Sequence, residues 1–296
     1  MLRPSGSRWS LLVFSLFCTL ILAGCSANRL LYNRADTFIR WAADDYVALT
    51  RDQQAAFDSR LDEFLSWHRS EELPHYRHFI VNALATLEEG VTLEEAVVIS
   101  EEIDLAADRF QARFIELLLA TGEDLSDEQI QEFLGALDES QAEYAKKRLV
   151  RDEETYYADS AKTMTDLVKR LMGRLNTAQK GDISLRSKQL MRIDGLWHDD
   201  RARWGSELRR LLETRTPGWQ DEVRKLGETR SEARIPDYVA GIEHNGEVIL
   251  SLLVDVINSR TDRQDRRMRR FLKGLIDDID ALTSASVAER LVVEQG

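Results

Sequence analysis

The sequence predicts an all-α protein, an elongated multi-helix bundle that follows an N-terminal signal segment. Apolar residues recur at the three- and four-residue intervals of amphipathic helices, whereas alternating β-branched stretches are almost absent. Several segments also carry the side-chain pattern of a helix N-terminal cap. Because each apolar stripe needs a surface to pack against, we expect the helices to cover one another in a single bundle.

The apolar stripes define the expected helices. Within each stripe the large apolar side chains fall on one face of a helix, which is the face that we expect to be buried. In chain order the stripes lie at 31–46, 57–65, 76–87, 99–117, 190–211, 238–256 and 268–282. A longer stretch, 130–172, is also expected to be helical, with a mostly charged and solvated middle at 146–154.

Capping boxes mark five of the expected helix starts. In such a box the first side chain and the fourth satisfy each other's free backbone amides. The boxes begin at Thr50, Thr92, Ser126, Asn176 and Thr261. Helix breaks are expected near Leu73-Pro74, Gly90, Thr121-Gly122, 173–176, 216–218 and 235–236.

The N-terminus has the layout of a secretory signal. Arg3 and Arg8 precede an apolar run of 12 residues, Leu11 to Leu22, which is too short to cross a bilayer. The segment Leu22-Ala23-Gly24-Cys25 that ends this run resembles the bacterial lipobox. An uncleaved signal anchor is the alternative interpretation.

The lipobox resemblance implies where the mature protein begins and where it resides. Residues 1–24 would be removed as a signal peptide, Cys25 would carry the acyl chains (palmitate among them), and 25–29 would form a lipidated tether. Ser26 follows the cysteine where inner-membrane lipoproteins carry Asp. The resemblance therefore favours the periplasmic face of the outer membrane over the inner membrane.

Composition limits the classes of function. The 296-residue chain has 40 basic and 52 acidic residues and a formal net charge of −12, which argues against general nucleic-acid binding. Of its two cysteines, Cys18 would leave with the signal and Cys25 would be blocked by lipid, so thiol catalysis is not expected. No Pro/Gly/Ser-rich linker divides the remainder, which predicts a single all-helical domain at 30–296.

Two resemblances bear on function. Leu49-Thr50-Arg51-Asp52-Gln53 matches the Leu-Thr-x-x-Gln motif of the Spy-like periplasmic chaperones, and related boxes follow Leu125 and Leu175. Any capped helix after a leucine would show the same five residues. More of the chain resembles a domain-of-unknown-function family of proteobacterial lipoproteins, through Tyr32-Asn33-Arg34 and the segments 40–53 and 67–76. That resemblance implies a helical lipoprotein and no particular activity.

The segments behind this resemblance contain the residues that we select as a candidate partner-binding or structural network. They combine aromatic, cationic and acidic side chains, which occur both at binding hot spots and in buried polar networks. The selected residues are Arg40, Trp41, Asp44, Asp45, Tyr46, Trp67, His68, Arg69, Glu71 and Glu72. We expect Trp41 and Trp67 to lock two antiparallel helices together, and Arg69, Glu71 and Glu72 to lie on the surface.

Neither a catalytic motif nor a metal motif is evident. His68, His75 and His78 lie near carboxylates, but no His-Glu-x-x-His is present, and we expect neither a metal nor another cofactor. His198 has Asp199 and Asp200 beside it as possible orienting carboxylates. Paired carboxylates of a glycosidase type are set in space and stay open.

The densest basic segment runs from Arg260 to Lys273. Its acidic neighbours form the expected pairs Asp262–Arg266 and Asp265–Arg269, which is typical of a solvated helix face. Docking onto lipid phosphates or onto an acidic partner is the other interpretation.

Taken together, the sequence predicts a lipid-anchored periplasmic protein that acts by binding an envelope partner, as a scaffold, assembly factor or chaperone-like module. The alternative is an envelope hydrolase that uses carboxylates in a helical cleft. A pocket with two carboxylates about 5 to 9 Å apart would favour the hydrolase, and a shallow aromatic groove would favour the binding protein.

Overall fold

The computed structural model describes residues 27–294, with side chains for residues 29–284. Within that part of the chain the regular structure is entirely helical, so the all-α prediction is confirmed. The elements are α2 (Ala27–Tyr32), α3 (Ala35–Asp44), α4 (Arg51–Trp67), η1 (His68–Glu72), α5 (Leu73–Thr86), α6 (Leu93–Gly122), α7 (Asp127–Tyr144), η2 (Ala145–Leu149), α8 (Glu153–Met172), α9 (Thr177–Ser187), α10 (Asp194–Thr214), α11 (Trp219–Glu228), α12 (Pro236–Asn258) and α13 (Asp262–Glu294). The segments η1 and η2 are single π-helical turns.

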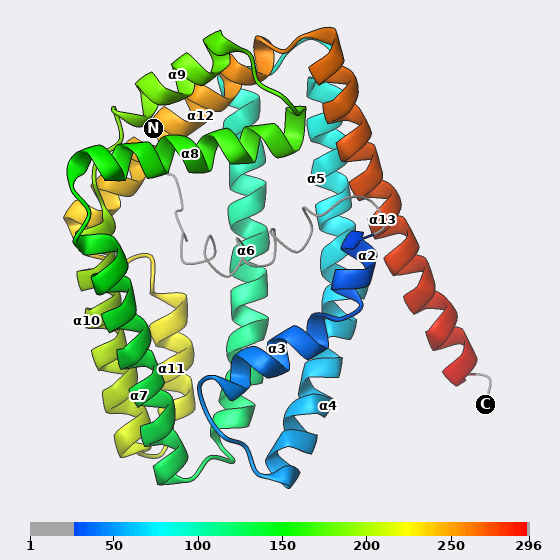
Figure 1. The fold of residues 1–296 in the computed structure, drawn as a ribbon. Helices are drawn as coiled ribbons and strands as arrows, with labels where there is room; N and C mark the ends of the chain where they lie inside the picture. Colours follow the sequence, from blue (N-terminus) through cyan, green and yellow to red (C-terminus); the bar gives the residue numbers. More distant parts are fainter. Residues whose placement is uncertain (1–26, 295–296) are drawn as a thin grey trace.

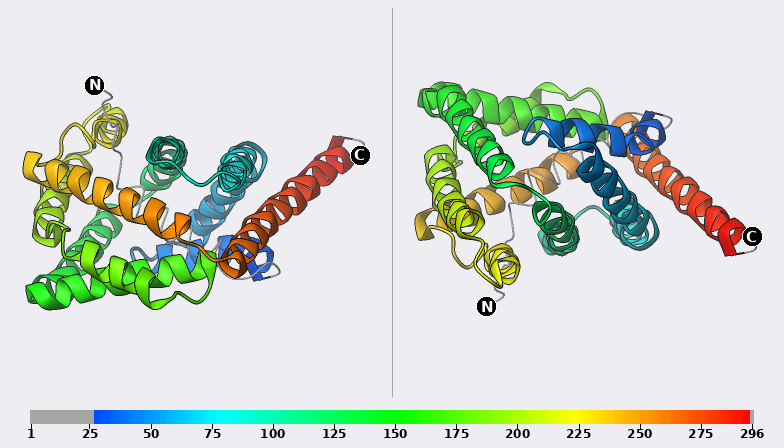
Figure 2. Two further views of the ribbon diagram at one scale, coloured as in Figure 1. Left: turned by 90° about the horizontal axis from the view of Figure 1, so that it is seen from above. Right: turned by 90° about the horizontal axis from the view of Figure 1, so that it is seen from below.

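The helices are arranged as a frame (Figure 1). In that view α8, α9 and α12 form the upper end, α7, α10 and α11 one side, and α5 and α13 the other, while α6 runs between the two sides. Contacts between α5 and α13, α8 and α9, and α7 and α10 hold these groups together. The two end-on views in Figure 2 show α13 diverging from the remaining helices toward the C-terminus.

One apolar core links the first and last helices of the described chain. It includes Tyr32 of α2, Leu61 of α4, Leu252 of α12 and Leu282 of α13. A second core, which includes Leu134 of α7 and Trp219 of α11, fills the corner formed by α7, α10 and α11. Removing a leucine side chain as buried as that of Leu61, which is 0% exposed, costs about 2–5 kcal/mol.

All five predicted capping boxes are present. At Thr50, Thr92, Ser126 and Asn176 the cap side chain accepts a hydrogen bond from the third helical amide, and the side chain of that third residue accepts one from the cap amide. Thr261 and Gln264 make the same reciprocal pair at the start of α13. The predicted starts of α4, α6, α7, α9 and α13 are therefore confirmed.

The helix break predicted at Leu73-Pro74 is wrong. The chain continues from α4 through η1 into α5, and the amide of Leu73 donates to the carbonyl of His68, one residue further back than in an α-helix. Pro74 then follows in the first turn of α5, directly after the wider π turn, and has no amide proton to donate back to that turn. The π turn thus accommodates the proline without ending the helix.

Other element bounds also differ from the expected ones. The stripe 31–46 is divided between α2 and α3, and the stretch 130–172 is interrupted between η2 and α8. The helix expected from 190 begins at Asp194. Helix α11 was not predicted, because no apolar stripe was identified over its residues. Within the expected tether, residues 27–29 belong to α2, and Arg29 forms an ion pair with Asp278 of α13 at 3.1 Å.

None of the described helices is long and apolar enough to cross a membrane. The predicted signal peptide, 1–24, and the predicted lipid attachment at Cys25 lie outside the described residues.

Candidate functional site

The ten residues selected from the sequence separate into two groups. Trp67, His68, Arg69, Glu71 and Glu72 lie at the end of α4 and in the π turn η1. Arg40, Trp41 and Asp44 lie in α3, and Asp45 and Tyr46 follow in the turn before α4. The two groups are joined through contacts between α3 and α4, and Figure 1 shows α3 crossing α4 obliquely rather than lying along it.

The π turn carries a buried polar pair. His68 is 0% exposed and Glu72 is 1% exposed, and both side chains face the interior from one turn of η1. The Nδ1 atom of His68 lies 2.9 Å from the hydroxyl oxygen of Tyr32. The carboxylate of Glu72 accepts two hydrogen bonds from Arg109 of α6, at 2.9 Å from Nε and 2.6 Å from Nη2. Through η1, the polar pair ties α2 and α6 to the α4–α5 helix.

Burial determines the protonation state of His68. Burial, together with the neighbouring charge of Arg69, lowers the pKa of His68 to about 3, so the imidazole is neutral at neutral pH. Burial likewise raises the pKa of Tyr32 above its usual value. The hydrogen bonds from Arg109 to Glu72 raise the pKa of the Arg109 guanidinium. The Glu72–Arg109 interaction is a charge-assisted bidentate pair with one partner fully buried.

Aromatic rings surround this buried pair. Trp67 is half-buried, with its ring centroid 5.7 Å from that of Phe64, and the guanidinium of Arg113 lies 5.3 Å from the Trp67 ring. Arg69, also half-buried, places its guanidinium 5.5 Å from the ring of Tyr32. Of the residues expected at the surface, Glu71 is exposed, whereas Glu72 is buried because Arg109 compensates its charge.

The α3 group lies mostly at the surface. Trp41 is 62% exposed, so the expectation that it locks two helices is wrong; its ring makes an edge contact with the ring of Phe38, with 5.8 Å between centroids. Arg40 attaches α3 to α4 by donating to Asp58 at 2.8 Å, and it also pairs with Asp36.

At the end of α3 and in the turn that follows, the acidic residues lie at the surface and the aromatic residue is half-buried. Asp44 and Asp45 are exposed, so neither carboxylate belongs to a buried polar network. Tyr46 is half-buried, and its ring lies 6.2 Å from that of Phe133 of α7. The turn is therefore held by Tyr46, and its two carboxylates face solvent.

Two residues of the buried network were not selected from the sequence. Tyr32 was part of the family resemblance only, and Arg109 lies within the stripe 99–117. Arg109 lies next to the apolar residues Ala106 and Phe110 of that stripe, so it could have been expected near the edge of the buried face, but the sequence does not say which of the 52 acidic residues it meets.

The remaining chemical candidates lie apart from this network. His75 and His78 are exposed on α5. The Nδ1 atom of His198 lies 3.2 Å from the carboxylate of Asp199, whereas Asp200 is buried and pairs with Arg230. Within the described residues no three His, Cys, Asp or Glu side chains form a group that could hold a metal ion.

The basic segment from Arg260 to Lys273, most of which lies in α13, presents two faces. Arg260 and Arg269 share Asp265, both at 2.8 Å, and both donate to the carbonyl oxygen of Leu87, so they support the fold. The expected Asp265–Arg269 pair is therefore present, whereas no ion pair is found between the described side chains of Asp262 and Arg266.

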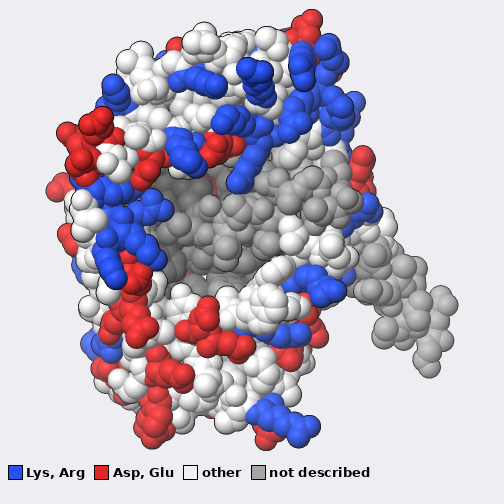
Figure 3. Space-filling model, in the orientation of Figure 1, with Lys and Arg blue, Asp and Glu red and all other residues white. Residues whose placement is uncertain are grey.

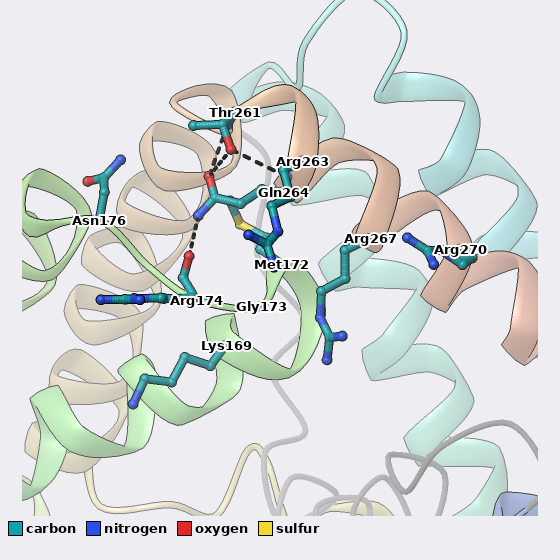
Figure 4. Close-up of a pocket in the computed structure, with 10 residues that line it drawn as sticks. All are labelled: Lys169, Met172, Gly173, Arg174, Asn176, Thr261, Arg263, Gln264, Arg267 and Arg270. Carbon is teal, nitrogen blue, oxygen red and sulfur yellow. Dashed lines mark hydrogen bonds between the residues drawn. The ribbon is translucent and has the colours of Figure 1, made fainter.

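The second face of α13 lines a pocket of about 660 Å³ between the end of α8 and the start of α13 (Figure 4). Arg263, Arg267 and Arg270 come from α13, and Lys169 and Arg174 come from α8 and the turn that follows it. Figure 3 shows Lys and Arg gathered along this upper end, with Asp and Glu gathered below over α7. The described residues that line the pocket include five cations and no carboxylate, so the pocket matches neither the paired-carboxylate cleft nor the aromatic groove that the sequence left open.

Comparison with known proteins yields one family. Residues 45–239, more than half of the chain, match the model of a family of unknown function, DUF6279. No curated protein and no solved structure matches the chain.

Proposed function

The chain belongs to DUF6279, a family of unknown function, and we propose that it is a lipid-anchored cell-envelope protein that binds a protein partner through the exposed face of α3. The family supplies no activity, so the proposal rests on this chain's own residues. The observation that carries it is the exposed aromatic pair formed by Phe38 and Trp41.

The aromatic pair has the composition of a binding hot spot. Phe38 is 37% exposed and Trp41 is 62% exposed, and Trp is among the residues that contribute most to protein interfaces. Arg40 holds this helix against α4 through Asp58, so the aromatic rings stand on a fixed support. The exposed carboxylates of Asp44 and Asp45 at the end of α3 could provide a polar rim.

The lipobox-like segment supports a position close to a membrane surface. If Cys25 carries acyl chains, α3 begins ten residues later and cannot start more than about 35 Å from the anchored residue, even with a fully extended chain. Ser26 after the cysteine supports the outer membrane, periplasmic face. A partner of α3 would then be an envelope protein located near that membrane.

Anchoring is tested separately from binding. We expect Cys25→Ser to abolish metabolic fatty-acid labelling and to release or misprocess the protein, and Ser26→Asp to move it toward the inner-membrane fraction. Labelling that persists in Cys25→Ser would refute the anchor without affecting the proposal for α3.

Binding is tested with a photo-crosslinking amino acid in place of the exposed Ala42 of α3, in native envelopes, with Trp41 either retained or changed to Ala. The matched control is Leu185→Ala, because Leu185 of α9 is 63% exposed and lies far along the chain. We expect Trp41→Ala to reduce capture of the crosslinked partner by about tenfold or more, with no such loss in Leu185→Ala. Equal capture by both variants, or crosslinks from position 42 to phospholipid alone, would contradict a protein partner at α3.

A further inference from the structure

We infer that the pocket between α8 and α13 binds a small phosphorylated ligand that carries at least two negative charges. This inference is independent of the proposed role of α3. It rests on the charge of the pocket wall, on how that wall is held, and on the size of the pocket.

Three arginines of α13 supply much of the positive charge of the pocket wall. Arg263, Arg267 and Arg270 are spaced four and three residues apart and therefore share one face of α13. Within the described part of the chain, neither these three guanidinium groups nor that of Arg174 has an acidic partner, whereas Arg269 of α13 and Arg260, which lies just before the helix, share Asp265. Lys169 has only Asp166 at 3.6 Å. A chain with a net charge of −12 thus keeps a row of uncompensated arginines around one cavity.

A buried pair of glutamine side chains holds the two walls of the pocket together. Gln264 and Gln179 exchange amide hydrogen bonds at 2.9 and 3.2 Å, and Gln264 also donates to the backbone carbonyl of Arg174 at 3.0 Å. Gln179 is 1% exposed and Gln264 is 5% exposed, so these bonds are shielded from water. They fix the turn after α8 against the start of α13, as Figure 4 shows for Gln264 and Arg174. The two cationic walls therefore have a set separation before any ligand arrives.

Gly173 ends α8 and lies against one of the pocket arginines. Its φ of 82° is in the region that favours glycine, and a Cβ placed there would lie 2.6 Å from Cδ of Arg267. The Arg267 side chain thus lies directly against the backbone of Gly173, where any other residue would displace it. The absence of a side chain at Gly173 therefore leaves room for Arg267 in the wall of the pocket.

The charge and the size of the pocket fit a phosphorylated ligand. Guanidinium groups bind phosphate oxygens in pairs of parallel hydrogen bonds, and a phosphate ester offers three such oxygens with up to two charges. A volume of about 660 Å³ lies within the range of small-molecule pockets, and the buried side chain of Met172 provides an apolar part of its lining. Charge and size together favour a phosphorylated organic group or a diphosphate over a single carboxylate. The headgroup of an anionic phospholipid and a free phosphorylated metabolite share this chemistry.

The test uses the full acylated chain purified in a neutral detergent. Isothermal titration calorimetry is performed with inorganic phosphate, pyrophosphate, dioctanoyl phosphatidic acid and, as the zwitterionic control, dioctanoyl phosphatidylcholine. We expect saturable binding of pyrophosphate or of phosphatidic acid that is stronger than binding of inorganic phosphate. Tighter binding of phosphatidic acid than of pyrophosphate would assign the pocket to a lipid headgroup, and the reverse order would assign it to a soluble ligand.

Variants decide whether the pocket itself binds. Arg267→Gln should weaken binding by about tenfold, since each charge-assisted contact contributes on that scale. Arg266→Gln is the matched control, because Arg266 is an exposed neighbour on the same helix and does not line the pocket. Gly173→Ala keeps every charge but displaces Arg267, and it should also weaken binding.

Three outcomes would overturn the inference. The first is no saturable binding of any phosphorylated probe. The second is an equal loss of affinity in Arg266→Gln and Arg267→Gln, which would show that binding reflects only general charge attraction. The third is displacement of pyrophosphate by a glutamate-rich peptide at equal charge concentration, which would assign the pocket to an acidic protein segment.

Discussion

Gln53 and Gln129 exchange hydrogen bonds through their side-chain amides, with 2.9 and 2.8 Å between the paired nitrogen and oxygen atoms. Each of these residues also closes a capping box, at the start of α4 and of α7 respectively. The two helix starts are therefore joined directly, although they lie 76 residues apart. Gln179 and Gln264 join the starts of α9 and α13 in the same way.

This relationship predicts that Gln129 stabilises more than its own helix. Gln129→Ala removes the bond to the Ser126 amide, the pair with Gln53 and the bond to the carbonyl of Ala48, and we expect a loss of about 2–3 kcal/mol in unfolding free energy. Glu95→Ala breaks a capping box whose third residue has no such partner, and it should cost about 1 kcal/mol. Chemical denaturation measures both, and equal losses in the two variants would contradict a role for the amide pair.

Because Glu72 is buried, breaking its pair with Arg109 should lower the unfolding free energy more than breaking a similar pair at the surface. Arg109→Ala leaves the buried carboxylate of Glu72 without its partner, which should cost about 3–5 kcal/mol. Arg77→Ala is the matched control, because Arg77 forms the same bidentate geometry with Asp280 at the surface, where the loss should stay below about 1 kcal/mol. Adding Glu72→Gln to Arg109→Ala should recover part of the stability. If Arg109→Ala lost no more unfolding free energy than Arg77→Ala, the charge of Glu72 would have to be balanced by a group other than Arg109.

The buried imidazole of His68 predicts a dependence of stability on pH. Because burial lowers its folded-state pKa to about 3 from an unfolded value of 6.5, the unfolded chain binds a proton between these values and the folded protein does not. The contribution of His68 to stability is therefore complete above pH 6.5 and falls as pH decreases, by about 1.4 kcal/mol per pH unit.

Denaturation curves between pH 7 and pH 4.5 test this sign, with the slope attributed to His68 missing in His68→Asn. The control is His78→Asn, which changes an exposed imidazole of α5. If His68→Asn retained the full slope of the wild-type protein, His68 would have to be protonated in the folded state, contrary to its burial.

Truncation of Trp67 should destabilise the protein, whereas truncation of Trp41 should leave its stability almost unchanged. Trp67 is half-buried against Phe64 and under Arg113, so Trp67→Ala should lower the unfolding free energy by about 2–4 kcal/mol. Trp41 is 62% exposed, and Trp41→Ala should stay within about 0.5 kcal/mol of the wild-type value. Thermal and chemical unfolding compare the two directly. A large loss in Trp41→Ala would mean that α3 is packed differently from the arrangement described above.

By itself, the sequence determined the fold class and five of the helix starts. A capping box joins residues only three positions apart, so its chemistry is complete within one segment and can be read without knowing the fold. The helix breaks at Gly90 and at 216–218 can also be predicted locally, because glycine readily adopts the positive φ found at Gly90 and Gly218. Pro74 misled the prediction because a π turn, which has no clear local signature, takes up the proline inside a continuous helix.

Only the tertiary structure decided the roles of the selected residues. In the sequence Trp41 and Trp67 look alike, as do Glu71 and Glu72, yet Trp67 is half-buried and Glu72 is buried, whereas Trp41 and Glu71 face solvent. Their burial depends on partners such as Arg109, which is 37 residues from Glu72. The cationic pocket likewise needs Arg174 and Arg267, which become neighbours when α8 meets α13. Long-range packing sets burial and charge proximity, and no local pattern contains that information.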